Sequence, residues 1–215
     1  MPEFRAAVFD LDGTLIDSMR VWDEIARDFL LRRGAEATRE FREKIIPMSY
    51  YETAEYMIKV FNLDEKPEDI VAHIMKTAAY EYAHSIRLKP YAEKYLRYLK
   101  DGGIKLAVAT ASPETLYVPV LKNNGVYGLF DAFVTLGEVS RPKSFPDIYL
   151  LAAEKLKVPP SECAVFEDIP EGIKGAKSAG MKAIGVFDET SEKYRKEMEA
   201  LSDGYIVSFR EMLPD

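Results

Sequence analysis

The chain has 215 residues, of which 47% are hydrophobic and 30% are charged, and its formal net charge is -7. This composition indicates a globular protein of one or two domains, and the acidic balance excludes a broad surface for nucleic acid or an anionic membrane. Because no apolar run approaches the ~18 residues of a membrane span and the amino terminus lacks a signal-peptide pattern, we expect a cytoplasmic protein.

The first predicted element is a short buried strand, Ala6-Ala7-Val8-Phe9, which is followed at once by Asp10, Asp12 and Gly13. Alternate residues of an extended segment point the same way, so the two carboxylates repel each other unless they share a cation. Oxygen-only ligands suit Mg²⁺, and ligands of open α/β sheets bind at the carboxyl ends of strands. An ordinary turn is the alternative, since Asp and Gly are common turn residues.

The longer string Asp10-Leu11-Asp12-Gly13-Thr14-Leu15-Ile16-Asp17-Ser18 resembles the first motif of the haloacid dehalogenase-like superfamily of phosphohydrolases. The resemblance implies an α/β fold with a Rossmann-like parallel-sheet core, an aspartyl-phosphate mechanism and Mg²⁺ as cofactor. It also implies that Asp10 is the nucleophile and that Asp12 acts as acid and then as base. The remaining motifs of the superfamily should follow in order.

Residues 19–84 have the pattern of long helices without a convincing strand, which indicates a helical insert. Apolar residues recur at helical spacing over residues 21–30, and Gly34 suits a C-cap after them. Residues 49–52 have the spacing of a capping box, and Pro67 suits the first turn of a further helix.

The rest of the chain alternates between helices and strands. A helix over residues 92–99 precedes a buried strand over residues 104–109, and Thr110 follows before a helix that Ser112 is expected to begin. A helix N-terminus at this place favours a bound anion, although a simple capping turn has the same pattern. In the superfamily a strand ending in Thr or Ser is the second motif, which implies that Thr110 and the adjacent Ala111 bind the substrate phosphate.

A third strand, over residues 132–135, leads to a loop that contains Lys143. A lysine ammonium suits a phosphate and screens a nearby carboxylate, although a lysine without such a context is usually solvated. The related superfamily pattern is Lys-Pro-x-Pro-Asp. Lys143, Pro146 and Asp147 keep its spacing, whereas Ser144 replaces the first proline. The resemblance therefore implies that Lys143 holds phosphate oxygens.

A fourth strand, over residues 164–166, runs into Glu167 and Asp168. An isolated acidic pair at a strand end is commonly a turn. The fourth motif of the superfamily is an acidic pair followed by Ser-x-x-Gly, and Gly172 matches it, whereas Ile169 replaces the serine. Because that change removes a supporting hydrogen bond, it puts the rate rather than the metal site in question.

The resemblance implies a ligand set for Mg²⁺. This set contains the Asp10 carboxylate, the Asp12 backbone carbonyl and Asp168, with Glu167 nearby.

Two further strands, over residues 182–186 and 204–207, complete the predicted sheet, and Ser191 is expected to cap the helix between them. The only cysteine, Cys163, lies in an apolar run. We interpret it as a buried core residue rather than a nucleophile.

A helical insert directly after the first motif resembles the subgroup with a four-helix cap. This subgroup includes phosphoglycolate phosphatases, small sugar-phosphate phosphatases and β-phosphoglucomutase. We expect residues 1–17 and 87–215 to form the catalytic core and residues 18–86 to form the cap. A glycine-containing loop with a basic tip is usual in that cap, whereas residues 44–50 contain no glycine. Specificity residues therefore cannot be assigned.

The motifs together predict a Mg²⁺-dependent phosphatase, monomeric or homodimeric, that acts on a small phosphorylated metabolite such as a sugar phosphate or a phosphoglycolate-like compound. The alternatives are a phosphomutase of the β-phosphoglucomutase type and a non-catalytic binding or regulatory protein. In our alignment of the motifs, the mutase has a histidine at the place of Trp22. Since an indole cannot serve as acid and base near neutral pH, Trp22 favours hydrolysis. Trp22 either packs against the leaving group or fills the cap core.

Overall fold

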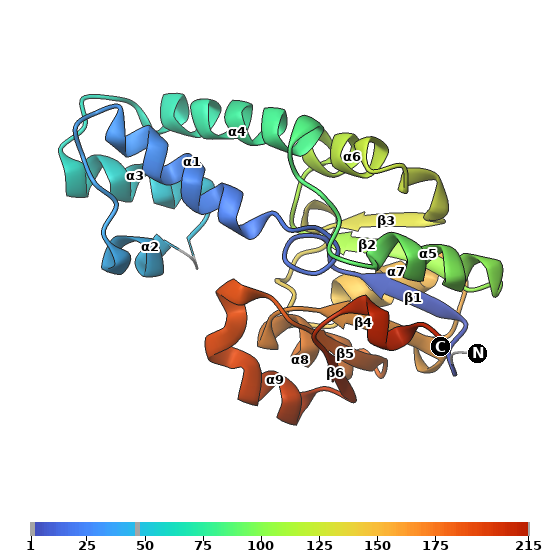
Figure 1. Cartoon of the computed structure of the whole chain (residues 1–215). Helices are drawn as coiled ribbons and strands as arrows, with labels where there is room; N and C mark the ends of the chain where they lie inside the picture. The colour runs from blue at the N-terminus through green and yellow to red at the C-terminus, as the bar shows by residue number, and fades with distance from the viewer. Residues whose placement is uncertain (1–2, 46–47, 215) are drawn as a thin grey trace. The chain divides into compact units, whose positions relative to one another are not determined.

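The computed structural model describes residues 3–45 and 48–214. The chain divides into two compact units, of which the first, here called the core unit, consists of Met1–Ser18 and Ile86–Asp215. The second, here called the helical unit, consists of Met19–Ser85. Both are drawn in Figure 1. Among the residues that the structure describes, no helix is long and apolar enough to cross a membrane.

The core unit contains a six-stranded sheet with the order β3-β2-β1-β4-β5-β6. All of its neighbouring strands are parallel, which confirms the predicted Rossmann-like α/β class. The strands lie where the sequence predicts them, with ends shifted at β2, β4 and β6, and Cys163 is buried in β4 as expected. Their bounds are β1 Ala6–Phe9, β2 Lys105–Thr110, β3 Ala132–Thr135, β4 Cys163–Glu167, β5 Lys182–Val186 and β6 Gly204–Ile206.

Helices cover both faces of this sheet, as expected for parallel strands that are apolar on both sides. Val8 belongs to an apolar cluster with residues of α7 and α8, whereas its neighbour Phe9 points to the opposite face. There the Phe9 ring stacks on Phe166 with centroids 4.6 Å apart and meets the ring of Tyr95 in α5 at 6.3 Å. The helices are α5 Ala92–Asp101, α6 Glu114–Asn123, α7 Asp147–Leu156, α8 Pro170–Ser178 and α9 Arg195–Leu201.

The described part of the helical unit consists of α1 Met19–Leu31, α2 Arg39–Ile45, α3 Tyr50–Phe61 and α4 Pro67–His84. Ser49 forms the predicted capping box with Glu52, and Pro67 begins α4 as expected. Gly34 follows α1 with a φ of 71°, a conformation that glycine adopts without strain. Part of the predicted glycine-free loop, at residues 46–47, lies outside the described residues.

Two predicted helix caps are wrong. Ser112 does not cap α6, because Pro113 is the N-cap residue and the Ser112 hydroxyl binds a carboxylate instead. Ser191 lies inside the short 3₁₀ helix Glu189–Tyr194, whose N-cap side chain is Asp188. Ser112 is thus taken up by a carboxylate far away in the sequence, whereas at Ser191 the side chain of Asp188 takes the cap position three residues earlier.

Candidate active site

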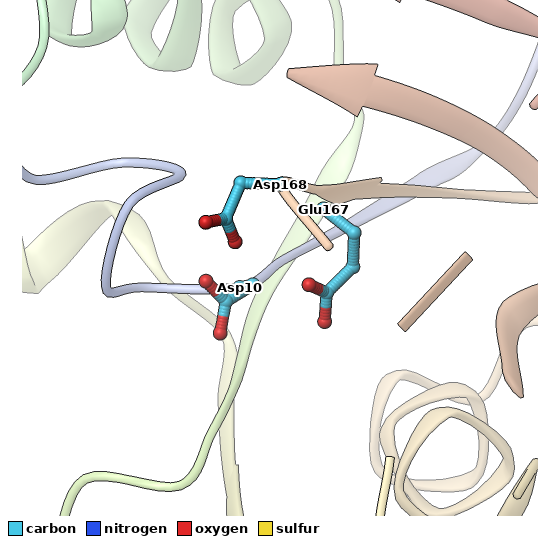
Figure 2. Close-up of side chains that lie close together, drawn as sticks. All are labelled: Asp10, Glu167 and Asp168. Atoms are coloured by element: carbon cyan, nitrogen blue, oxygen red, sulfur yellow. The ribbon is translucent and has the colours of Figure 1, made fainter. Parts of the chain in front are cut away.

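Three carboxylates meet at the carboxyl ends of β1 and β4, which are neighbours in the sheet (Figure 2). Asp10 follows the last residue of β1, Glu167 ends β4, and Asp168 comes next. All three residues are buried, and one carboxylate oxygen from each lies within 4.8 Å of the others. Gly13, with a φ of 82°, lets the chain turn sharply just after β1. The structure therefore brings together the two acidic motifs that the sequence places far apart.

Lys143 lies against two of these carboxylates. Its Nζ donates a hydrogen bond to Asp10 Oδ1 and another, 2.7 Å long, to Glu167 Oε1. Burial alone would lower the pKa of Lys143, but the negative charges of Asp10 and Glu167 outweigh it and raise that pKa above its usual value. The ammonium therefore stays charged at neutral pH.

One ammonium does not balance three buried carboxylates. Burial raises the pKa of Glu167 to about 7 against the opposing effect of Lys143, and burial with the charge of Asp10 raises that of Asp168 well above its usual range. Among the described residues, Asp10 Oδ2 and Glu167 Oε2 are buried without a hydrogen-bond partner. Thr14 donates to Asp168 Oδ1 at 3.2 Å. This all-oxygen set with excess negative charge fits a hard divalent cation such as Mg²⁺.

The Asp12 side chain is not part of the acidic cluster. Its two oxygens accept hydrogen bonds of 2.7 Å each from the hydroxyls of Ser18 and Ser112. Both serines are buried, so they fix the orientation of the carboxylate. Sequence reasoning assigned a cap to Ser112 and no role to Ser18. The signal that could have identified Ser112 is its position just after Thr110, at the end of a strand beside β1.

Thr110 ends β2 and is buried, at the same edge of the sheet as Asp10. Its Oγ1 accepts a hydrogen bond of 2.9 Å from the backbone N–H of Ser112, which leaves the hydroxyl hydrogen to donate elsewhere. Ala111, between them, is exposed. The position and chemistry of Thr110 suit a phosphate oxygen.

The two departures from the superfamily motifs differ in their structural consequences. Ser144 does not prevent the preceding Lys143 from reaching its partners. Ile169 is the N-cap residue of α8 and makes no side-chain cap hydrogen bond. The serine that the motif would place there could supply that bond.

Sequence reasoning missed Tyr149, which holds Glu167, and it did not show why Gly172 is required beside that carboxylate. The hydroxyl of Tyr149 in α7 donates to Glu167 Oε1 at 2.8 Å, although an aromatic residue in a helix has the pattern of ordinary core packing. Gly172 matches a superfamily motif, but only the structure shows why this position has to be a glycine. A Cβ atom at Gly172 would lie 2.3 Å from Glu167 Cδ, so α8 approaches this carboxylate too closely for a side chain.

The chain is similar to known proteins over most of its length. The family model of the haloacid dehalogenase-like hydrolases matches residues 4–180. A phosphorylated carbohydrates phosphatase of Thermotoga maritima is 28% identical over 180 residues, which cover 84% of this chain and 83% of the relative. Hexitol phosphatase A of Escherichia coli is 32% identical over 191 residues, which cover 85% of this chain and 82% of the relative.

A crystal structure of β-phosphoglucomutase from Clostridium difficile is similar in fold. Its TM-score is 0.76 at 23% sequence identity, and the match covers 98% of this chain and 93% of that one. Three findings point to the same family: the parallel sheet, the acidic cluster at its carboxyl edge and the family match over most of the sequence. The chain belongs to the haloacid dehalogenase-like hydrolases.

Proposed function

We propose that this chain is a Mg²⁺-dependent phosphatase that hydrolyses a small phosphorylated metabolite through an aspartyl-phosphate on Asp10. The observation that carries the proposal is the state of the Asp10 carboxylate. It is buried, its Oδ1 accepts from Lys143, and its Oδ2 has no hydrogen-bond partner among the described residues. Relatives named for phosphorylated carbohydrates and hexitol favour a sugar phosphate over a phosphoglycolate-like substrate.

In the proposed reaction, an oxygen of Asp10 forms a bond to phosphorus while the bond between phosphorus and the leaving alcohol breaks. Asp12 gives its proton to the alcohol oxygen. It then takes a proton from water while the water oxygen bonds to phosphorus and the bond between Asp10 and phosphorus breaks, which releases phosphate and restores the Asp10 carboxylate. Ser18 and Ser112 hold Asp12 for both steps.

The oxygens of the phosphoryl group also need a fixed positive charge and hydrogen-bond donors to hold them in place. Lys143 and the Thr110 hydroxyl would supply them, since this reaction depends mostly on positioning and electrostatics. Asp10, Asp168 and the Asp12 backbone carbonyl would hold Mg²⁺, with Glu167 nearby. When bound, Mg²⁺ neutralises charge on the phosphoryl oxygens.

The surroundings of Trp22 favour hydrolysis over transfer between sugar hydroxyls. Its Nε1–H donates to the hydroxyl of Tyr82 at 3.0 Å, and its ring stacks on Tyr50 with centroids 5.4 Å apart. The single donor of Trp22 is thus used inside the helical unit. These contacts support the interpretation that Trp22 fills the core of that unit, and an indole cannot carry a proton between substrate oxygens.

The proposal predicts that the purified protein releases inorganic phosphate from phosphorylated sugars when Mg²⁺ is present. Asp10→Asn should lower this rate by roughly 10³-fold or more, because it removes the nucleophile and keeps its shape. Asp17→Asn is the matched control, since Asp17 is exposed in the same segment. Circular dichroism should show both variants folded. Near-normal hydrolysis by folded Asp10→Asn would contradict the mechanism.

The same assay separates the alternatives. With β-glucose 1-phosphate and a catalytic amount of the 1,6-bisphosphate, free phosphate should appear faster than glucose 6-phosphate. The opposite order would establish a phosphomutase. A complete lack of turnover over a panel of phosphorylated metabolites would instead favour a binding or regulatory protein.

A further inference from the structure

The loop that carries Lys143 lies directly on α8 at Gly175. A Cβ atom at Gly175 would be 1.9 Å from the carbonyl oxygen of Lys143 and 2.8 Å from that of Phe145. It would also be 2.8 Å from Cε2 of Tyr149. Contacts this short with backbone atoms cannot be relieved by rotating a side chain, so the loop can lie here only because residue 175 has none.

Backbone conformation does not explain this glycine. Gly175 lies inside α8 and is not among the glycines with a positive φ. In the interior of a helix, glycine is about 1 kcal/mol less favourable than alanine. The close approach of the loop is the compensating feature.

Arg141 also holds this loop, through contacts of its own. The Nε–H of its guanidinium group donates a hydrogen bond of 2.9 Å to Asp147 Oδ1, and its Nη2 lies 2.8 Å from Oδ2 as an ion-pair contact. It also lies over the ring of Phe145, with Cζ 4.6 Å from the ring centroid. Because Asp147 is the first residue of α7, this paired contact ties the start of the loop to the helix that follows it.

We propose that Gly175 and Arg141 are positioning residues that place the Lys143 ammonium between Asp10 and Glu167. This inference rests on the proposed function, in which Lys143 holds phosphate oxygens. The Lys143 side chain is buried and reaches two carboxylates at once, so a displaced backbone cannot be offset by a new side-chain conformation without losing one of them. Hydrogen bonds to ions weaken steeply as their geometry worsens.

Two substitutions test this inference through two separate sets of contacts. Gly175→Ala fills the space under the Lys143 carbonyl, and Arg141→Gln removes the paired contact with Asp147. The matched controls are Gly128→Ala, where a Cβ would meet nothing within 4 Å, and Arg97→Gln, which removes an exposed contact of 2.9 Å with Glu93. Thermal unfolding shows which variants are folded.

The first measurement is competitive inhibition of the phosphatase by inorganic phosphate. In Gly175→Ala and Arg141→Gln we expect the inhibition constant to rise about tenfold, with a fall in kcat, because a displaced ammonium binds phosphate oxygens less well. The two controls should match the original protein. A general loss of packing would lower thermal stability without weakening phosphate inhibition in the fraction that remains folded.

The second measurement does not depend on activity. Brief treatment with acetic anhydride and peptide mass spectrometry report the labelling of Lys143 relative to Lys196, which is exposed. Buried and paired, Lys143 should be protected in the original protein and in the controls, and it should become labelled in the two test variants.

Unchanged phosphate inhibition and unchanged protection of Lys143 in both folded variants would overturn the inference. If Gly175→Ala does not fold, Arg141→Gln decides alone, because Arg141 is exposed and its loss leaves the core intact. If the original protein hydrolyses no phosphomonoester, the proposed function fails. The labelling result still shows whether Gly175 and Arg141 place Lys143.

Discussion

At the scale of a single residue, opposing effects set the pKa of Glu167. Burial raises its pKa, the Lys143 ammonium lowers it, the charge of Asp10 raises it, and the net value is about 7. An unfolded glutamate has a pKa near 4.3. Between about pH 4.3 and 7 the unfolded chain therefore gives up a proton that the folded chain keeps, so the free energy of unfolding falls as pH rises through this window.

The raised pKa of Glu167 predicts how the stabilisation by Mg²⁺ depends on pH. A cation that shares the oxygens of the acidic cluster favours their ionised forms, so its binding releases protons and strengthens as pH rises. We expect the increase in Tm produced by Mg²⁺, relative to a chelator, to be small at pH 5 and larger at pH 8. Scanning calorimetry at several pH values measures it.

Two variants serve as controls for that experiment. Glu167→Gln removes the titrating carboxyl and should flatten the pH dependence, whereas Glu154→Gln, at an exposed position, should leave it unchanged. An equal increase in Tm at pH 5 and pH 8 would show that the acidic cluster is not the Mg²⁺ site.

At the scale of helices and strands, the sequence predicted the features that neighbouring residues determine. Apolar runs predicted the strands. Ser49 and Glu52 predicted a helix cap, because these two residues lie within one helical turn. Ser112 shows the limit. Its hydroxyl binds Asp12, which lies 100 residues away in the sequence, and the capping pattern after Ser112 does not indicate this partner.

The candidate site divides in the same way. Strand ends predicted the edge of the sheet at which Asp10 and Asp168 lie, whereas only the resemblance to the superfamily pattern indicated Lys143. Tyr149 and Gly175 act through contacts with other elements. In the sequence the first is an ordinary helix aromatic and the second an ordinary helix glycine, so only the three-dimensional structure identifies them.

The segment that follows the helical unit is fastened to the end of β5 by a nearly buried ion pair. Lys89 Nζ lies 2.9 Å from Asp188 Oδ2 and donates to the Phe187 carbonyl at 2.6 Å. Burial would raise the pKa of Asp188, but hydrogen bonds from Thr190 and the charge of Lys89 outweigh it and lower that pKa. The backbone N–H of Lys89 also donates to Leu15 O at 2.8 Å, so the pair braces the chain next to the first motif.

We predict that Lys89→Met lowers the free energy of unfolding of the core unit by about 3 kcal/mol, because it leaves the Asp188 carboxylate buried without a cation. The double variant Lys89→Met/Asp188→Asn should lose less than the sum of the two single variants. Urea unfolding followed by circular dichroism measures these changes. Lys174→Met, which removes an exposed ion pair, is the control and should cost far less. Additive losses in the double variant would show that the two charges do not act as a pair.

At the scale of the whole molecule, the core unit is built from two separate stretches of chain, and the helical unit is built from one. Asp10 comes from the first stretch of the core unit, whereas Lys143, Glu167 and Asp168 come from the second. The candidate metal site is thus formed only when both stretches have folded together. The helical unit has its own buried residues, among them Phe29, Met57, Ile70 and Tyr82.

A ligand stabilises the part of the structure that binds it. If the two units unfold separately, Mg²⁺ should therefore stabilise the core unit and not the helical unit. We predict that Mg²⁺ slows amide hydrogen exchange in β1, β4 and the segments after them, and that it leaves α1, α3 and α4 unchanged. Mass spectrometry of peptides from the intact chain, with Mg²⁺ and with a chelator, measures both. Fluorescence offers an independent check, since the only tryptophan, Trp22, belongs to the helical unit.

In urea, Mg²⁺ should therefore move the unfolding midpoint seen by circular dichroism further than the midpoint seen by Trp22 fluorescence. Ca²⁺ at the same concentration is an informative comparison. It accepts looser oxygen geometry, so it should also protect β1 and β4 while inhibiting phosphate release. If Mg²⁺ slowed exchange equally in both units and moved both midpoints together, the chain would unfold as one cooperative block, and the division into a metal-binding core and a separate helical unit would be wrong.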